Sequence, residues 1–120
     1  MANIYLDTNI LIDLYERNQD RNKELVNHTL YVSPLSCHIL SYTTKIKIPD
    51  SALNKLISNM TSVSLNKEIL SRSLEGPTND LEDNLQLHSA VTSHSDYFLT
   101  RDKRLLNMKY FGKLEIVDHL

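Results

Sequence analysis

Four aspartates stand at positions where carboxylates commonly take part in catalysis. Asp7 directly follows the apolar segment Asn3–Leu6, and Asp102 follows a second apolar segment after a two-residue gap. Asp80 and Asp83 begin a long amphipathic segment, and their spacing places them on roughly the same face of a helix. Carboxylates gathered in one place repel one another and raise one another's pKa, a conflict that a divalent cation removes.

Hard oxygen ligands favour Mg²⁺ or Mn²⁺, which bind a few carboxylates and keep several waters. Such a metal activates water for in-line attack on a phosphodiester. Each acid also has a structural explanation, because Asp80 or Asp102 can cap a helix and Asp83 can interact with a helix dipole. Asp7 is harder to explain in this way, since Thr8 or Asn9 can supply the cap. The order of the acids along one small chain favours the metal site.

The elements that must position these residues alternate along the chain. Short apolar segments indicate strands at 3–6, 30–32, 60–65, 97–99 and 114–117. Helical spacing indicates helices after Thr8, near 24–29, over 35–45, from a first turn that contains Pro49, over 67–74, from Asp80 to about Ser93, and over 105–108. Alternation of strands and helices predicts an α/β sandwich around a mostly parallel sheet of about five strands. Asp7 and Asp102 then meet at one sheet edge if the first and fourth strands are neighbours.

Composition limits the remaining possibilities. A chain of 120 residues with 41% hydrophobic residues suits one domain over 1–120. The single cysteine, Cys37, excludes an intramolecular disulfide. No apolar run approaches the roughly 20 residues that span a bilayer, so we expect a cytoplasmic protein without membrane association. The net charge of −2 does not indicate a polyanion binder, although five basic residues and one acid lie between 101 and 113.

Three segments resemble the motifs of the PIN-domain family, the metal-dependent nuclease module of VapC-type toxins. The segment 4–11 resembles the family's first acidic motif, 80–86 its third, and 97–102 the strand-to-loop motif that supplies the fourth acid. Chain length, motif order and a terminal strand agree, so the resemblance covers essentially the whole chain. It implies a PIN-like three-layer α/β/α sandwich.

The resemblance also implies the site residues. The catalytic metal ligands for Mg²⁺ or Mn²⁺ would be Asp7, Asp83 and Asp102. Asp80 would be an additional or outer-sphere ligand, and Asn9 and Thr100 would orient the carboxylates. The RNA backbone would follow the basic residues beside the pocket. These are Arg101, Lys103 and Arg104.

The activity implied is that of a single-strand-selective endoribonuclease, the toxin of a type II toxin–antitoxin pair. Its partners would be an RNA substrate, a small antitoxin protein that covers the acidic pocket, and a second copy of the chain in a homodimer. A haloacid-dehalogenase phosphatase would also begin with an Asp after its first strand. That chemistry needs a second Asp two residues later, where this chain has Asn9.

The chain departs from the family in the helix after the second strand, where the family usually carries a second acid, often Glu. No carboxylate occurs between Glu24 and Asp50. Ser36 and His38 are polar residues of this segment that could approach the site, although a lone His on an apolar segment is more often a packed structural residue. The missing acid leaves an alternative open, a PIN-like RNA- or protein-binding module with weak or no turnover.

Overall fold

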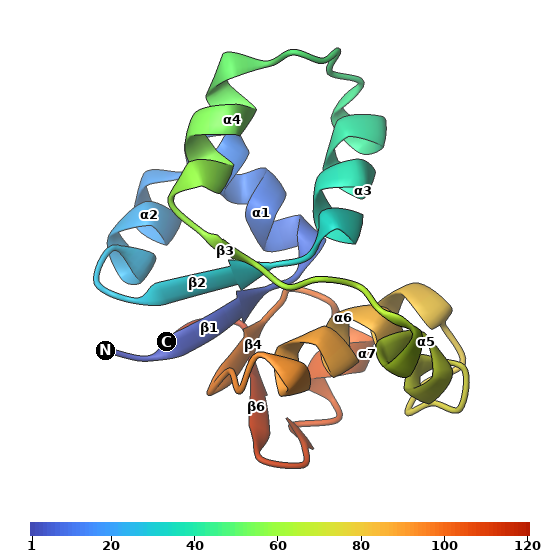
Figure 1. Cartoon of the computed structure of the whole chain (residues 1–120). Coiled ribbons are helices and arrows are strands. Elements are labelled where there is room, and N and C mark those ends of the chain that lie inside the picture. The colour runs from blue at the N-terminus through green and yellow to red at the C-terminus, as the bar shows by residue number, and fades with distance from the viewer.

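The computed structural model describes residues 1–120 and contains a six-stranded sheet in the order β3-β2-β1-β4-β6-β5 (Figure 1). Neighbouring strands are parallel except β5 and β6. The strands are β1 (Asn3–Leu6), β2 (Thr29–Val32), β3 (Thr61–Ser62), β4 (Tyr97–Leu99), β5 (Tyr110–Phe111) and β6 (Leu114–Val117). Because β1 and β4 are central neighbours, their carboxyl ends lie at the same sheet edge.

Seven helices cover the two faces of the sheet. Figure 1 shows α1 to α4 on one side and α5 to α7 on the other. The helices are α1 (Thr8–Tyr15), α2 (Gln19–Leu25), α3 (Pro34–Thr44), α4 (Ser51–Ser58), α5 (Lys67–Ser73), α6 (Leu81–Thr92) and α7 (Lys103–Leu106). None of them is long and apolar enough to cross a membrane. The three-layer α/β/α architecture predicted from the sequence is confirmed.

The core divides into two clusters, because successive residues of a strand point to opposite faces of the sheet. Ile4 and Leu6 of β1 pack with α1, α2, α3 and α4 in one cluster. Tyr5 faces the other way and packs with Leu87 of α6 and with Phe98 of β4, and the rings of Tyr5 and Phe98 stack at 5.6 Å. Strand β1 is therefore buried on both faces, as expected for the centre of a parallel sheet.

Three helices have boundaries that differ from the sequence prediction by two residues or more. One is α7, which begins at Lys103 after its cap Asp102 and ends at Leu106, instead of covering 105–108. Helix α2 begins at Gln19 rather than near Glu24, because the Asn18 side chain caps it by accepting a hydrogen bond from the Arg21 backbone N–H at 3.0 Å. The cap thus begins the helix inside the polar stretch 17–23, which has no apolar residue to indicate helical spacing. Helix α4 begins after its cap residue Asp50, so Pro49 precedes the helix.

The sheet also differs from the prediction at its edges. Strand β3 contains two residues instead of six, and the antiparallel strand β5 was not predicted. Strand β5 forms a hairpin with β6 through Gly112, whose φ of +63° suits glycine. A two-residue strand produces too little alternation to be recognised in the sequence.

Asn84 connects α6 to the segment before it. Its buried side chain, 3% exposed, donates to the carbonyls of Ser73 at 2.8 Å and Thr78 at 2.9 Å. It also accepts from the backbone N–H and hydroxyl of Thr78. The Thr78 hydroxyl in turn accepts from the backbone N–H of Asp80, so this network fixes the start of α6.

We expect Asn84→Ala to destabilise the fold by about 2 kcal/mol, because it leaves buried carbonyls without donors. Urea denaturation measures the change in the free energy of unfolding. The matched control is Asn22→Ala, which removes one exposed bond to the Asn18 carbonyl and should cost less than about 0.5 kcal/mol. Equal effects of the two substitutions would contradict this role of Asn84.

Candidate active site

Four helices begin with an aspartate cap, and three of these acids, Asp7, Asp80 and Asp102, are candidate site residues. Oδ1 of Asp7 accepts from the Thr8 backbone N–H at 2.8 Å and caps α1, whereas the sequence suggested Thr8 or Asn9 as the cap. Asp80 caps α6 and Asp102 caps α7 through their own Oδ1 atoms. The helix N-termini attract negative charge, which partly offsets the cost of bringing carboxylates together.

Asp7 is held by the two residues predicted to orient it. The Thr100 hydroxyl donates to Asp7 Oδ2 at 2.7 Å, and Asn9 Nδ2 donates to the same oxygen at 3.3 Å. Thr100 Oγ1 also accepts from the Asp102 backbone N–H at 3.0 Å. The buried Thr100 side chain therefore connects Asp7, at the end of β1, to the loop that carries Asp102 after β4.

The carboxylates lie close enough to influence one another. Burial raises the pKa of Asp7, which is only 6% exposed, and the charge of Asp102 raises it further. Burial also raises the pKa of Asp83 to about 6, with additional contributions from Asp80, Asp7 and Asp102. Three separate segments thus bring negative charge to one edge of the sheet.

Glu82 joins this group although the sequence did not single it out. Burial raises its pKa first, followed by the charges of Asp80 and Asp7. In the sequence, only its position directly before Asp83, in the first turn of α6, could have indicated that Glu82 belongs to the site. An acid at a helix start has an ordinary structural explanation, so its electrostatic coupling to Asp7 emerges only from the fold.

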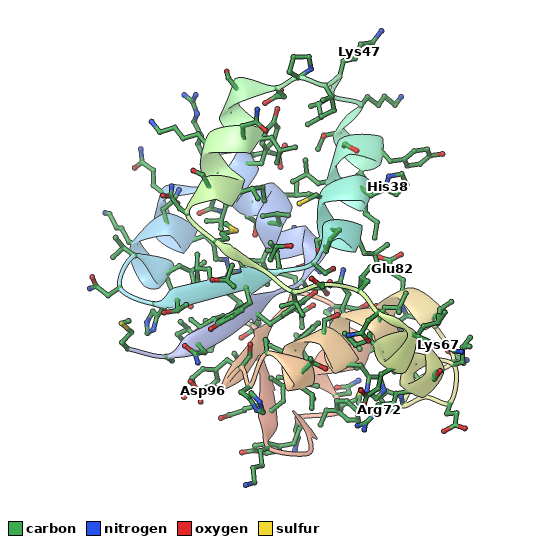
Figure 2. The ribbon with its side chains drawn as sticks, viewed as in Figure 1. His38, Lys47, Lys67, Arg72, Glu82 and Asp96 are labelled. Atoms are coloured by element: carbon green, nitrogen blue, oxygen red, sulfur yellow. The ribbon has the colours of Figure 1, made fainter.

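Helix α3 brings no acid to the site. Ser36 is fully buried, and its hydroxyl donates to Gln86 Oε1 at 3.1 Å and accepts from Gln86 Nε2 at 3.0 Å. His38 is exposed, and Figure 2 shows its side chain projecting outward from α3. Neither residue therefore contacts the carboxylates.

The buried Gln86 amide is the centre of a polar network beside Asp7. Besides Ser36, it contacts the Tyr5 hydroxyl, which donates to Oε1, and the Thr8 hydroxyl, which accepts from Nε2 at 3.3 Å. Burial raises the pKa of Tyr5 to about 12, so Tyr5 remains a neutral donor. The network joins β1, α1, α3 and α6 and has no carboxylate in it.

The three predicted RNA-binding residues have different environments. Arg101 forms an ion pair with Asp13 at 3.2 Å and donates to the carbonyl of Asn9 at 3.3 Å, with its side chain 54% exposed. Lys103 is exposed and forms no ion pair. Arg104 turns toward the acids: its Nη2 lies 3.4 Å from Asp102 Oδ2 and 3.7 Å from Asp83 Oδ2.

No group of three or more His, Cys, Asp or Glu side chains is arranged closely enough to hold a metal ion. The kind of donor nevertheless suits a hard cation, because carboxylate oxygens with raised pKa values are stabilised by positive charge. Mg²⁺ is commonly bound through one or two carboxylates with water completing its shell. The available donors therefore suit such an ion without a complete protein cage.

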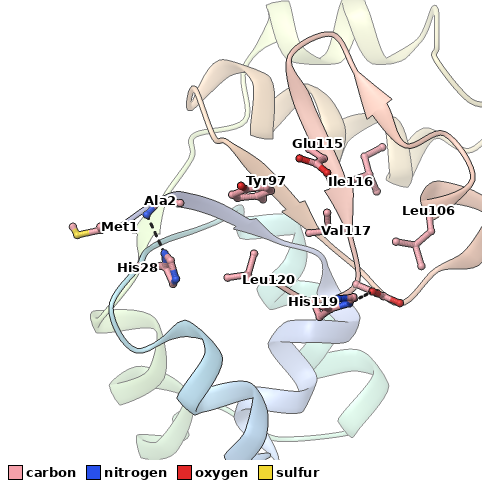
Figure 3. A pocket seen from close by; sticks show the side chains of 11 residues that line it. Met1, Ala2, His28, Tyr97, Leu106, Glu115, Ile116, Val117, His119 and Leu120 are labelled. Carbon is pink, nitrogen blue, oxygen red and sulfur yellow. Dashed lines mark hydrogen bonds and ion pairs between the residues drawn. The ribbon is translucent and has the colours of Figure 1, made fainter.

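A cavity of about 670 Å³ lies away from the acids (Figure 3). It is bordered by the N-terminal residues Met1 and Ala2, by His28 before β2 and by Tyr97 at the start of β4. None of the candidate acids lines it. The size of a cavity therefore does not locate the candidate site, whereas the convergence of charge does.

No family model matches the sequence, and no curated protein matches it. Solved structures match over nearly the whole chain. A chain of VapBC2 from Rickettsia felis, bound to a DNA fragment from its promoter, has a TM-score of 0.71 at 17% identity, covering 97% of this chain and 99% of that chain. VapC20 from Mycobacterium tuberculosis, a sarcin–ricin loop cleaving toxin, has a TM-score of 0.67 at 7% identity, covering 93% and 98%.

The chain has the PIN fold of VapC toxins. A toxin–antitoxin complex from Klebsiella pneumoniae is also similar, with a TM-score of 0.74 at 18% identity over 92% of this chain and 94% of that chain. At these identities the likeness to VapC structures is one of fold. What the acids at the sheet edge do must be inferred from the residues themselves.

We expect the metal-free chain to lose stability as the pH rises through the folded pKa of Asp83. The ordinary pKa of this group is 3.8 and its folded value is about 6, so between these values the folded chain holds the proton more tightly than the unfolded chain. The stabilising effect of protonation is therefore present at pH 4 and lost by about pH 7. Because Asp7 and Glu82 also have raised pKa values, Asp83→Asn should reduce this loss rather than abolish it, and should gain about 1 kcal/mol at pH 7.5 after a discount for solvent screening and the lost Arg104 contact.

Thermal unfolding in a chelating buffer at pH 4, 5.5 and 7.5 measures the difference. Asp20→Asn, on the exposed first turn of α2, is the matched control and should follow the wild type. If Asp83→Asn shows the same pH dependence as the wild type, the electrostatic description of the site is wrong.

Proposed function

We propose that this chain is a Mg²⁺- or Mn²⁺-dependent endoribonuclease that hydrolyses RNA phosphodiester bonds, and that it is the toxin of a type II toxin–antitoxin pair. The observation that supports the proposal is the meeting of Asp7, Asp83 and Asp102 at the carboxyl edge of β1 and β4 in a VapC-like fold. One similar structure is a toxin that cleaves the sarcin–ricin loop, and another is a toxin–antitoxin complex.

The metal would be bound directly by one or two of Asp7, Asp83 and Asp102, with water between it and the rest, and Asp80 and Glu82 would add negative charge nearby. When bound, the ion supplies Lewis-acid activation of water and neutralises charge at the phosphodiester. Thr100 and Asn9 keep the Asp7 carboxylate in one orientation. Because Asp7 is buried, that orientation is fixed before substrate arrives.

Basic residues next to the acids would bind the RNA backbone. The loop and helix that follow β4 carry Arg101 and Lys103, both exposed to solvent. The ion pair with Asp13 fixes the direction of Arg101, while Lys103 is free to follow a phosphate. A flexible backbone of single-stranded RNA can bring a phosphodiester to the acidic edge while its neighbours contact these cations.

The same charge distribution is suited to an antitoxin. A small protein that places a basic side chain among the four aspartates would neutralise them and block the metal and the substrate together. We therefore expect the antitoxin to bind at this edge. A homodimer is expected from the family resemblance.

The alternative is a PIN-like RNA- or protein-binding module with weak or no turnover. It is favoured by one observation, that α3 contributes Ser36 to a buried network and no acid to the site. Calorimetric titration separates the two functions. Intact RNA binding without saturable Mg²⁺ or Mn²⁺ binding at millimolar concentration would favour the binding module.

We expect purified protein to cleave single-stranded RNA with Mn²⁺, and Asp7→Asn or Asp102→Asn to lower the rate at least about 100-fold. Loss of a residue that merely orients a metal ligand typically costs 10–100-fold, so loss of a ligand itself should cost no less. Asp20→Asn controls for the charge change outside the site. Equal cleavage by Asp7→Asn and the wild type would assign the activity to a contaminant.

We expect Lys103→Gln to weaken RNA binding equally for different sequences, because a phosphate contact reads no base. The slope of log K against log salt concentration should become shallower by about 0.7, the value for one contact to a single strand. Fluorescence anisotropy with 2′-O-methyl RNA at several salt concentrations measures it. Lys23→Gln, on the exposed part of α2, should leave the slope unchanged. An unchanged slope for Lys103→Gln would remove this residue from the interface.

A further inference from the structure

Arg104 lies between two of the acids proposed to hold the metal. Its Nη2 is 3.4 Å from Asp102 Oδ2 and 3.7 Å from Asp83 Oδ2. These two acids come from different elements, since Asp83 is in the first turn of α6 and Asp102 caps α7. No other cationic side chain forms an ion pair with either of them. One guanidinium therefore occupies the position between them.

Arg104 contacts both carboxylate oxygens of Asp102. Asp102 Oδ1 accepts from the backbone N–H of Arg104 at 2.9 Å, and Oδ2 faces the Arg104 guanidinium. A cation that binds Asp102 and Asp83 together must displace this side chain or share its position. A guanidinium and a divalent ion at the same carboxylates repel each other, so their binding is competitive.

The Arg104 contact is also easily broken. Its side chain is 71% exposed and reaches the acids from the solvent side, whereas the side chain of Asp83 is 13% exposed. Exposed ion pairs contribute little to stability because solvent screens them and a long side chain loses entropy when fixed. Arg104 can therefore leave without disturbing the core, and its planar guanidinium suits a phosphate as well as a carboxylate.

We propose that Arg104 is an internal counter-ion that occupies the acidic site of the metal-free chain, competes with the divalent ion for Asp83 and Asp102, and transfers to the RNA backbone when the ion binds. This inference rests on the proposed function and adds a regulatory element to that site. Metal binding exposes Arg104 for RNA, and RNA binding draws Arg104 away from the acids. The two ligands therefore strengthen each other's binding, as linkage requires.

The first test is Mn²⁺ binding, measured by isothermal titration calorimetry on the whole chain without RNA. Arg104→Gln should bind Mn²⁺ about 3- to 5-fold more tightly than the wild type, the range expected when an exposed ion pair no longer competes. Arg104→Lys, which keeps the charge but not the planar fork, should fall between them. Arg72→Gln is the matched control, because it also removes an exposed arginine in an ion pair, with Glu68 at 2.9 Å. It should bind Mn²⁺ like the wild type.

A second control in the metal titration distinguishes the direct contact of Arg104 with the acids from the effect of net charge alone. Lys103→Gln removes the same charge one residue away without touching a carboxylate, so it should tighten Mn²⁺ binding less than Arg104→Gln does. Equal tightening by both substitutions would show that net charge alone matters and would overturn the role of Arg104. Circular dichroism confirms that each exposed substitution leaves the fold intact.

The coupling to RNA gives an independent readout. Mn²⁺ should raise the affinity for 2′-O-methyl RNA more in the wild type than in Arg104→Gln, because only the wild type releases an arginine. Identical Mn²⁺ affinities of the wild type and Arg104→Gln overturn the Arg104 proposal and leave the metal nuclease standing. If no variant binds Mn²⁺, both the metal dependence and the competition are wrong.

Discussion

The main physical constraint on this structure is electrostatic: several carboxylates lie together at a poorly solvated sheet edge, which costs free energy. Asp7 is buried, and its pKa is raised by that burial and by Asp102. Three hydrogen-bond donors, the Thr100 hydroxyl, the Thr8 backbone N–H and the Asn9 side-chain amide, oppose this rise and favour the charged form. The negative charge that these donors leave uncompensated attracts any cation that reaches the edge, whether a metal ion or a basic side chain.

The fold brings to this edge both the carboxylates and the backbone N–H groups that partly neutralise them. Parallel pairing of β1 with β4 brings Asp7 and the Thr100–Asp102 loop together. Three helices begin there, each capped by one of the aspartates, so their backbone N–H groups partly neutralise the acids. The structural and chemical explanations of these aspartates are therefore compatible, since each helix cap uses only one of the two carboxylate oxygens.

The sequence predicted the fold well because its central elements have strong local signals. Strand β1 and the helix from Asp80 were placed correctly to within a residue. The start of α2 and strand β5 were wrong or missed because a single cap or a two-residue strand produces little periodicity. Asn9 and Thr100 do contact Asp7, while their role in orienting a metal ligand stays a prediction. The coupling of Glu82 and the position of Arg104 depend on side-chain geometry, which no spacing reveals.

Because α3 carries no acid, all the carboxylates near the candidate site come from other elements. With Ser36 engaged by Gln86, α3 stabilises the scaffold beneath Asp7 and adds no ligand. The negative charge then concentrates at the start of α6, where Asp80 is the cap, Glu82 and Asp83 lie in the first turn, and Asp7 is nearby. Fewer fixed carboxylates lower the affinity for a cation, and a guanidinium with competing access lowers it further. A site of this kind would bind metal more weakly without RNA than when an RNA phosphate draws the arginine away, which couples the catalytic ion to the presence of substrate.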